Sequence, residues 1–136
     1  MDSMGVFSVS ASALQAERER LNVIASNMAN ANSTRTEEGG PYKRRDVVFS
    51  AEPVGGSGDS TLEGVRVEEI VKENAFRKYY DPSHPDADKN GYVTAPDINV
   101  IEEMVNMMTA YRAYEASVST FNTTKSMILK TLELGN

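Results

Sequence analysis

The C-terminal segment of the chain carries a heptad repeat, which strongly limits the folds that the chain can adopt. Residues 97–134 contain neither proline nor glycine. Alternating steps of four and three residues from Val100 to Leu132 meet an apolar or aromatic side chain at nine of ten positions. These positions are Val100, Met104, Met107, Tyr111, Tyr114, Val118, Phe121, Lys125, Ile128 and Leu132. A repeat of 3.5 residues is typical of a coiled-coil seam, so we predict one long helix with a packed face.

The ends of this helix are marked by residues that cap helices. Asn99 suits the N-cap, with Glu102 three residues further on, and Gly135 suits the position after the last turn. A helix over residues 99–134 is roughly 54 Å long at 1.5 Å per residue. A monomer of 136 residues cannot enclose a helix of that length, so we expect neighbouring chains to cover part of it.

The N-terminal segment shows a weaker version of the same repeat. Steps of four and three residues from Phe7 meet six apolar side chains at eight positions, interrupted by a charged cluster at residues 17–20. The eight positions are Phe7, Ala11, Leu14, Arg18, Leu21, Ala25, Met28 and Asn32. We expect the interfaces between subunits to be formed by Phe7, Leu14, Leu21, Ile24 and Met28, together with the nine apolar residues of the C-terminal seam.

Asparagines are unusually frequent in the second half of this N-terminal helix. The segment from Asn22 to Thr34 contains no charged residue, although a helix with one solvated face should carry some. We therefore interpret Asn22, Asn27 and Asn30 as polar contacts that set the register inside a packed helical assembly. The alternative for Asn30 and Asn32 is a helix end that frays into a loop, because amides suit a terminus.

The middle of the chain differs in composition from both ends. Residues 34–96 hold all five prolines and seven of the nine glycines. Short strands are expected at residues 47–49, 64–72, 76–80 and 91–94, with a flexible loop at residues 55–58. The predicted fold class is α+β, in which long N- and C-terminal helices pair as an antiparallel coiled coil around an inserted β-rich module. The expected segments are residues 1–33, 34–96 and 97–136.

Composition excludes several classes of function. The chain has no cysteine, one histidine and a formal net charge of −6, which argues against thiol chemistry and against a general nucleic-acid binder. We find no nucleophile–base pair, so we predict no catalytic site and no cofactor. The N-terminus lacks the basic and apolar regions of a cleavable secretory signal, and no apolar run is long enough to insert into a membrane.

The stretch from Asp86 to Asp97 has the spacing of a calcium-binding loop. Oxygen-bearing side chains fall at positions 1, 3, 5, 9 and 12, and Gly91 is at position 6. However, position 12 is an aspartate, Pro96 occupies the expected exiting helix, and residues 80–85 cannot form the entering helix. A polar turn with Asn90-Gly91 at its corner is therefore favoured over a calcium site.

Several blocks of the sequence resemble the flagellar basal-body rod proteins. They are SASALQAERERLNVIASNMANANSTRT at residues 10–36, GGPYKRRDVVF at residues 39–49, HPDADKNGYV at residues 84–93 and the C-terminal seam at residues 99–135. They follow the order and spacing found in that family and span nearly the whole chain. The last of these blocks resembles the proximal rod members and separates the chain from the longer distal-rod and hook proteins, which carry larger middle domains.

The resemblance implies a structural role rather than an enzymatic one. Proteins of this family are subunits of the rod, the drive shaft that transmits torque across the periplasm, and the flagellar type III apparatus exports them without a cleaved signal. Their paired terminal helices form the inner layer of a helical tube, with the β-rich domain outside. The implied partners are copies of the chain, other rod proteins and the adaptor between the MS ring and the rod.

The residue pattern by itself leaves two other functions open, a coiled-coil adaptor and a calcium-binding module. The exposed seams of an isolated chain also predict that both terminal segments are largely disordered before assembly and fold during it.

Overall fold

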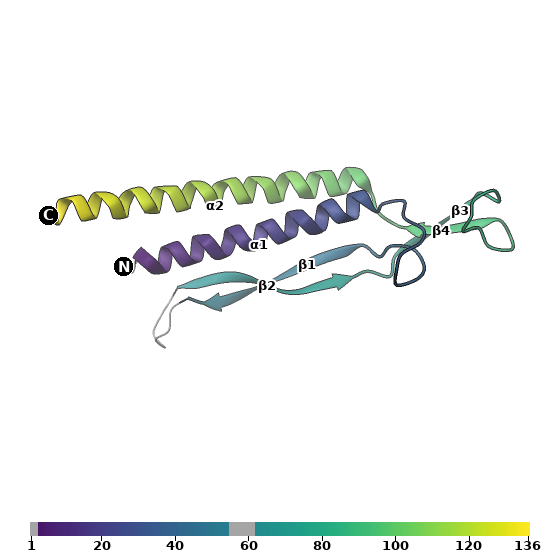
Figure 1. The fold of residues 1–136 in the computed structure, drawn as a ribbon, viewed down its shortest axis with the longest axis horizontal. Helices are drawn as coiled ribbons and strands as arrows, with labels where there is room; N and C mark the ends of the chain where they lie inside the picture. Colours follow the sequence, from purple (N-terminus) through teal and green to yellow (C-terminus); the bar gives the residue numbers. More distant parts are fainter. Residues whose placement is uncertain (1–2, 55–61) are drawn as a thin grey trace.

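Two long helices lie side by side and antiparallel in the computed structural model, which describes residues 3–54 and 62–136 (Figure 1). Helix α1 spans Ser3–Ala29 and helix α2 spans Val100–Leu134. The rings of Phe7 and Phe121 meet edge to face, with their centroids 4.6 Å apart. Both termini therefore lie at the same end of the molecule, and the predicted antiparallel pairing is confirmed.

Helix α2 begins and ends where the capping residues predict. The side-chain oxygen of Asn99 accepts hydrogen bonds from the backbone N–H groups of Ile101 and Glu102, at 3.1 and 3.3 Å. At the other end, the N–H of Gly135 donates to the carbonyl oxygen of Thr131. These contacts satisfy backbone groups that a helix end leaves unpaired.

A long β-hairpin packs along α1 on a different side from α2 (Figure 1). Strand β1 (Arg45–Pro53) pairs antiparallel with β2 (Glu63–Lys72). The backbone N–H of Val65 donates to the hydroxyl of Ser12 on α1 at 3.1 Å. A Cβ atom on the neighbouring Gly64 would lie 2.6 Å from that hydroxyl oxygen, so glycine is what allows the strand to approach the helix this closely.

A second, shorter β-ladder extends past the ends of the helices, away from the termini (Figure 1). Strand β3 (Phe76–Tyr80) pairs antiparallel with β4 (Tyr92–Pro96). All four predicted strands are therefore confirmed: β3 has the predicted bounds, β1 and β2 are longer than predicted, and β4 is shifted by one or two residues. The predicted loop at residues 55–58 lies outside the described residues.

The segment with calcium-loop spacing is a hydrogen-bonded turn. Gly91 has φ +85°, a left-handed conformation that favours glycine, and Asp88 accepts hydrogen bonds from the N–H groups of Asn90 and Tyr92 at 2.8 and 2.9 Å. The two carboxylate oxygens of Asp86 bind the Thr34 hydroxyl and the Arg35 guanidinium in the loop after α1. Over residues 3–54 and 62–136, no three acidic, histidine or cysteine side chains converge to hold a metal ion. Asp86 instead connects the turn to the loop after α1, and Asp88 stabilises the turn itself.

The same hydrogen bonds make the turn sensitive to acid. The Thr34 hydroxyl is the main cause that lowers the pKa of Asp86, and the Tyr92 N–H is the main cause that lowers the pKa of Asp88. A carboxyl whose pKa is lowered by folding stabilises the structure above its unfolded pKa, near 4, and loses that contribution as the pH falls through the folded value.

We expect amide hydrogen exchange at residues 34–36 and 86–92 to accelerate as the pH falls below about 4, ahead of exchange in the helices. In Asp86→Asn, residues 34–36 should lose this pH dependence, because the ionised partner of Arg35 is absent at every pH. Residues 88–92 should keep it, since they depend on Asp88. Exchange measured by NMR, corrected for the intrinsic pH dependence, tests this; an unchanged response of residues 34–36 in the variant contradicts it.

Candidate subunit interface

Helix α2 carries two heptad seams rather than the single predicted one. The inner seam consists of the buried and half-buried residues that face α1. It comprises Glu103, Met107, Ala110, Tyr114, Ser117, Phe121, Thr124 and Ile128. The outer seam runs along the neighbouring flank of the helix, about 100° around its axis, because most of its residues directly follow a residue of the inner seam. It comprises Ile101, Met104, Met108, Tyr111, Glu115, Val118, Asn122, Lys125, Leu129 and Leu132.

The predicted seam is therefore divided between the two faces. Met107, Tyr114, Phe121 and Ile128 belong to the inner seam. Met104, Tyr111, Val118 and Leu132 belong to the outer seam, and Val100 is exposed at the start of the helix. The difference has a geometric reason: Met104, Tyr111 and Val118 each directly follow a residue of the inner seam, and one residue turns the helix by about 100°, so they lie on the next flank.

The outer seam exposes large apolar side chains along the length of α2. The exposed fraction is 74% for Ile101, 58% for Met108, 54% for Tyr111 and 62% for Leu132. These apolar residues form two groups, at residues 101–111 and 129–132, and polar residues 115, 122 and 125 lie between them. Exposed groups of large apolar side chains such as these mark an interaction surface.

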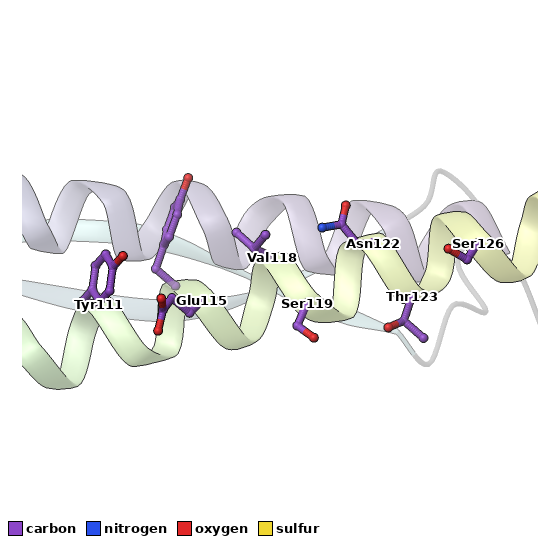
Figure 2. Close-up of a pocket in the computed structure, with 8 residues that line it drawn as sticks. Tyr111, Glu115, Val118, Ser119, Asn122, Thr123 and Ser126 are labelled. Atoms are coloured by element: carbon purple, nitrogen blue, oxygen red, sulfur yellow. The ribbon is translucent and has the colours of Figure 1, made fainter.

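The middle of the outer seam borders a shallow groove on α2 (Figure 2). Figure 2 shows Tyr111, Glu115, Val118 and Asn122 along this flank, with the small side chains of residues 119 and 123 beside them. The groove is open to solvent and has no enclosed cavity in which a small molecule could be surrounded, so it resembles a helix-packing surface more than a ligand pocket.

Helix α1 has protein on two of its sides within a single chain. The predicted residues Phe7, Leu14, Leu21 and Met28 are half-buried and Ile24 is buried. The hairpin covers a second side (Figure 1). The remaining exposed side, which we call the outer stripe, comprises Met4, Ser8, Ala11, Gln15, Arg18, Asn22, Ala25 and Ala29. This arrangement accounts for the scarcity of charge in the second half of α1.

Asn27 joins α1 to the start of the hairpin rather than to another helix. Its side chain is fully buried. The amide nitrogen donates to the carbonyl oxygen of Arg45 at 2.8 Å, and the amide oxygen accepts from the N–H of Arg45 at 2.9 Å and from the hydroxyl of Tyr42 at 3.0 Å. The amide thus pairs with the backbone of β1 as a neighbouring strand would. The hydrogen bonds of Asn27 therefore join a helix to a strand within one chain, and not one helix to another.

The other two predicted asparagines occupy different environments. Asn22 is exposed on the outer stripe. Asn30 follows the last residue of α1, where its amide nitrogen donates to the carbonyl oxygen of Ser26 at 2.9 Å and its amide oxygen accepts from the hydroxyl of Ser33 at 3.1 Å. Asn30 therefore acts at the helix end, as the alternative interpretation proposed.

A buried ion pair connects α2 to the hairpin. Glu103, 1% exposed in the first turn of α2, accepts a hydrogen bond from Nε of Arg44, and Glu73 binds another nitrogen of the same guanidinium at 2.9 Å. Burial tends to lower the pKa of Arg44, but the hydrogen bond and charge of Glu103, with Glu73 and Asp46, raise it overall. Nothing in the sequence pattern points to this contact, because acidic residues are common in first helical turns.

Comparison with known proteins shows which family has a similar sequence. The family model for the flagella basal body rod protein matches residues 7–35, and the model for the C-terminal part of the flagellar basal body rod FlgEFG proteins matches residues 89–134. The chain is 44% identical over 136 residues to the flagellar basal-body rod protein FlgC of Salmonella typhimurium. It is 46% identical over 138 residues to FlgC of Yersinia enterocolitica and 37% identical over 150 residues to FlgC of Bacillus subtilis. Each alignment covers 99% of both chains.

The chain belongs to the FlgC family of flagellar basal-body rod proteins. The resemblance noted in the sequence is thereby confirmed, and the chain is a structural component of the flagellar basal body. The two family models cover α1 with the loop that follows it, and α2 with the turn and strand that precede it. None of the described helices of this rod protein is both long and apolar enough to cross a membrane.

We expect Asn27→Ala to lower the free energy of unfolding by about 3 kcal/mol, because it leaves the N–H and carbonyl of Arg45 and the hydroxyl of Tyr42 without their buried partner. The matched control is Asn22→Ala on the exposed stripe of the same helix, which should change stability by less than about 0.5 kcal/mol. Urea unfolding followed by circular dichroism measures both. Equal effects of the two variants would show that the Asn27 contacts do not secure the hairpin.

Proposed function

We propose that this chain is a subunit of the flagellar rod that packs with its neighbours through the outer seam of α2 and the outer stripe of α1. The observation that carries the proposal is the outer seam itself, in which six large apolar side chains are exposed in the described chain: Ile101, Met104, Met108, Tyr111, Leu129 and Leu132. Burying these apolar side chains stabilises a structure, and here only helices from other subunits can bury them. Because members of this family are rod proteins, the neighbouring subunits of a rod would provide those helices.

Under this proposal the terminal segments 1–33 and 97–136 form the inner layer of the rod, and residues 34–96 face outward. The support is the position of the hairpin, which lies against α1 and leaves the outer seam of α2 open (Figure 1). Asn27 and the Arg44–Glu103 pair then connect the outer module to the inner helices. Torque that reaches the helices would pass to the module through buried polar contacts that have fixed geometry.

The proposed partners are copies of this chain, other rod proteins and the adaptor between the MS ring and the rod. Export by the flagellar type III apparatus without a cleaved signal, and a final position in the periplasmic part of the basal body, accompany this assignment. They are supported by family membership. We propose no enzymatic role: His84, the one histidine, accepts a hydrogen bond from the N–H of Asp86 at 3.0 Å and so helps to form the turn.

We expect Met104→Asp to abolish swimming when it replaces the wild-type chain in cells, because a carboxylate in a covered apolar seam cannot be solvated. The purified variant should unfold within about 0.5 kcal/mol of the wild type, since Met104 is exposed in the free chain. Motility in soft agar and the recovery of basal bodies measure the effect.

Thr109→Asp is the control for this experiment. Thr109 is also exposed on α2 but lies off the outer seam, so the variant should swim. Normal swimming by Met104→Asp would rule out the outer seam as an assembly surface. A discrete, soluble oligomer in sedimentation experiments would instead favour the coiled-coil adaptor.

The free chain should be least protected at the C-terminal end of α2. In the register set by Phe7 and Phe121, the start of α1 at Ser3 lies level with residue 125, and α2 continues past it (Figure 1). An isolated helix of fewer than about 12 residues is marginal in water. We expect amides of residues 126–134 to exchange rapidly in the monomer and slowly in purified rods, while residues 107–114 are protected in both. This expectation is narrower than the prediction from sequence that both terminal segments are largely disordered before assembly, because α1 and α2 pack on each other within one chain. Slow exchange of residues 126–134 in the monomer contradicts it.

A further inference from the structure

The outer seam of α2 and the outer stripe of α1 have complementary side-chain sizes. The seam presents large residues such as Ile101, Met104 and Tyr111. Half of the stripe residues are small, and they include Ala25 and Ala29 at the end that lies level with the start of α2. A ridge of large side chains packs closely on a helix only where the opposing residues are small.

The two surfaces also match in register. Because α1 and α2 run antiparallel and Phe7 meets Phe121, each step along α1 corresponds to one step back along α2, and Ala25 lies level with Glu103. If a second copy lies beside the first at nearly the same height, its α1 presents Ala29 near Ile101 and Ala25 near Met104. The same spacing of four and three residues then continues along both helices.

The charges agree with this alignment. In the same register, Arg18 of one copy falls next to Tyr111 and within one helical turn of Glu115 of the other. Arg18 and Glu115 are both exposed, and neither forms an ion pair within the described part of the chain. An arginine between an aromatic ring and a carboxylate gains both a cation–π contact and an ion pair.

We propose that the outer seam of α2 packs against the outer stripe of α1 of a second copy of this chain, in the register that places Met104 beside Ala25. This rests on the proposed rod function and specifies one of its contacts. The two surfaces are different and lie on different helices, so the contact is heterologous. Each copy keeps one free surface for the next, and the contact repeats around the rod axis instead of ending at a dimer.

Single cysteines test this contact, because the chain contains none of its own. Cells would express two versions of the chain together, Ala25→Cys in one and Met104→Cys in the other. Both positions are exposed, so the substitutions should not disturb folding. After mild oxidation of purified basal bodies, non-reducing electrophoresis should reveal a disulfide-linked dimer only when both versions are present, since a disulfide requires Cα atoms within about 7 Å.

The register control pairs Ala11→Cys with Met104→Cys. Residue 11 lies fourteen positions from residue 25 on the same stripe, about 21 Å along the helix, so this pair should give no dimer. No dimer with the first pair, or equal dimers with both pairs, overturns the inference even when the chain is present in the basal bodies. The inference is also overturned if a thiol-to-amine cross-linker joins Met104→Cys to a rod protein of a different mass. That result would leave the proposed rod function unaffected. Absence of the chain from basal bodies overturns the proposed function as well.

Discussion

The close antiparallel approach of α1 and α2 is the contact on which the rest of the structure depends. Small residues at positions 110, 117 and 124 allow it, and the ring contact between Phe7 and Phe121 sets its register. Once these small residues face inward, the geometry of the helix forces Met104 and Tyr111 outward. The surface available for assembly is therefore determined by the same residues that hold the monomer together.

Features governed by neighbours in sequence were predicted well. The cap at Asn99, the end at Gly135 and the four strands follow from local hydrogen bonding and from alternating or absent apolar residues. The face of α2 that meets α1 was predicted only in part. Steps of four and three residues that begin at residue 100 and at residue 103 trace neighbouring stripes on the same helix. The sequence does not show which of these stripes packs against α1, because that depends on how the two helices fit together.

The polar junctions show a second reason why sequence was insufficient. Asn27 was identified as a register-setting residue, but its partner is Arg45, eighteen residues away and in a strand. The Arg44–Glu103 pair spans 59 residues and has no motif. Such contacts depend on how the β-rich module packs against the helices. The residue types indicate that a polar group is buried, but they do not identify the group that it binds. The charge-free part of α1 was interpreted as a helix enclosed in a packed assembly, whereas a single chain covers two of its sides and leaves Asn22, Ala25 and Ala29 exposed.

The unequal lengths of the helices affect how an assembly of such pairs would resist shear. Helix α2 has 35 residues and α1 has 27, and the excess lies at the end that carries both termini (Figure 1). If such helix pairs stack end to end along an axis, the unpaired end of α2 in one subunit would lie beside the next subunit along the axis. The boundary between successive subunits would then be staggered. Shear along that boundary would have to break lateral contacts between helices before one subunit could move past the next.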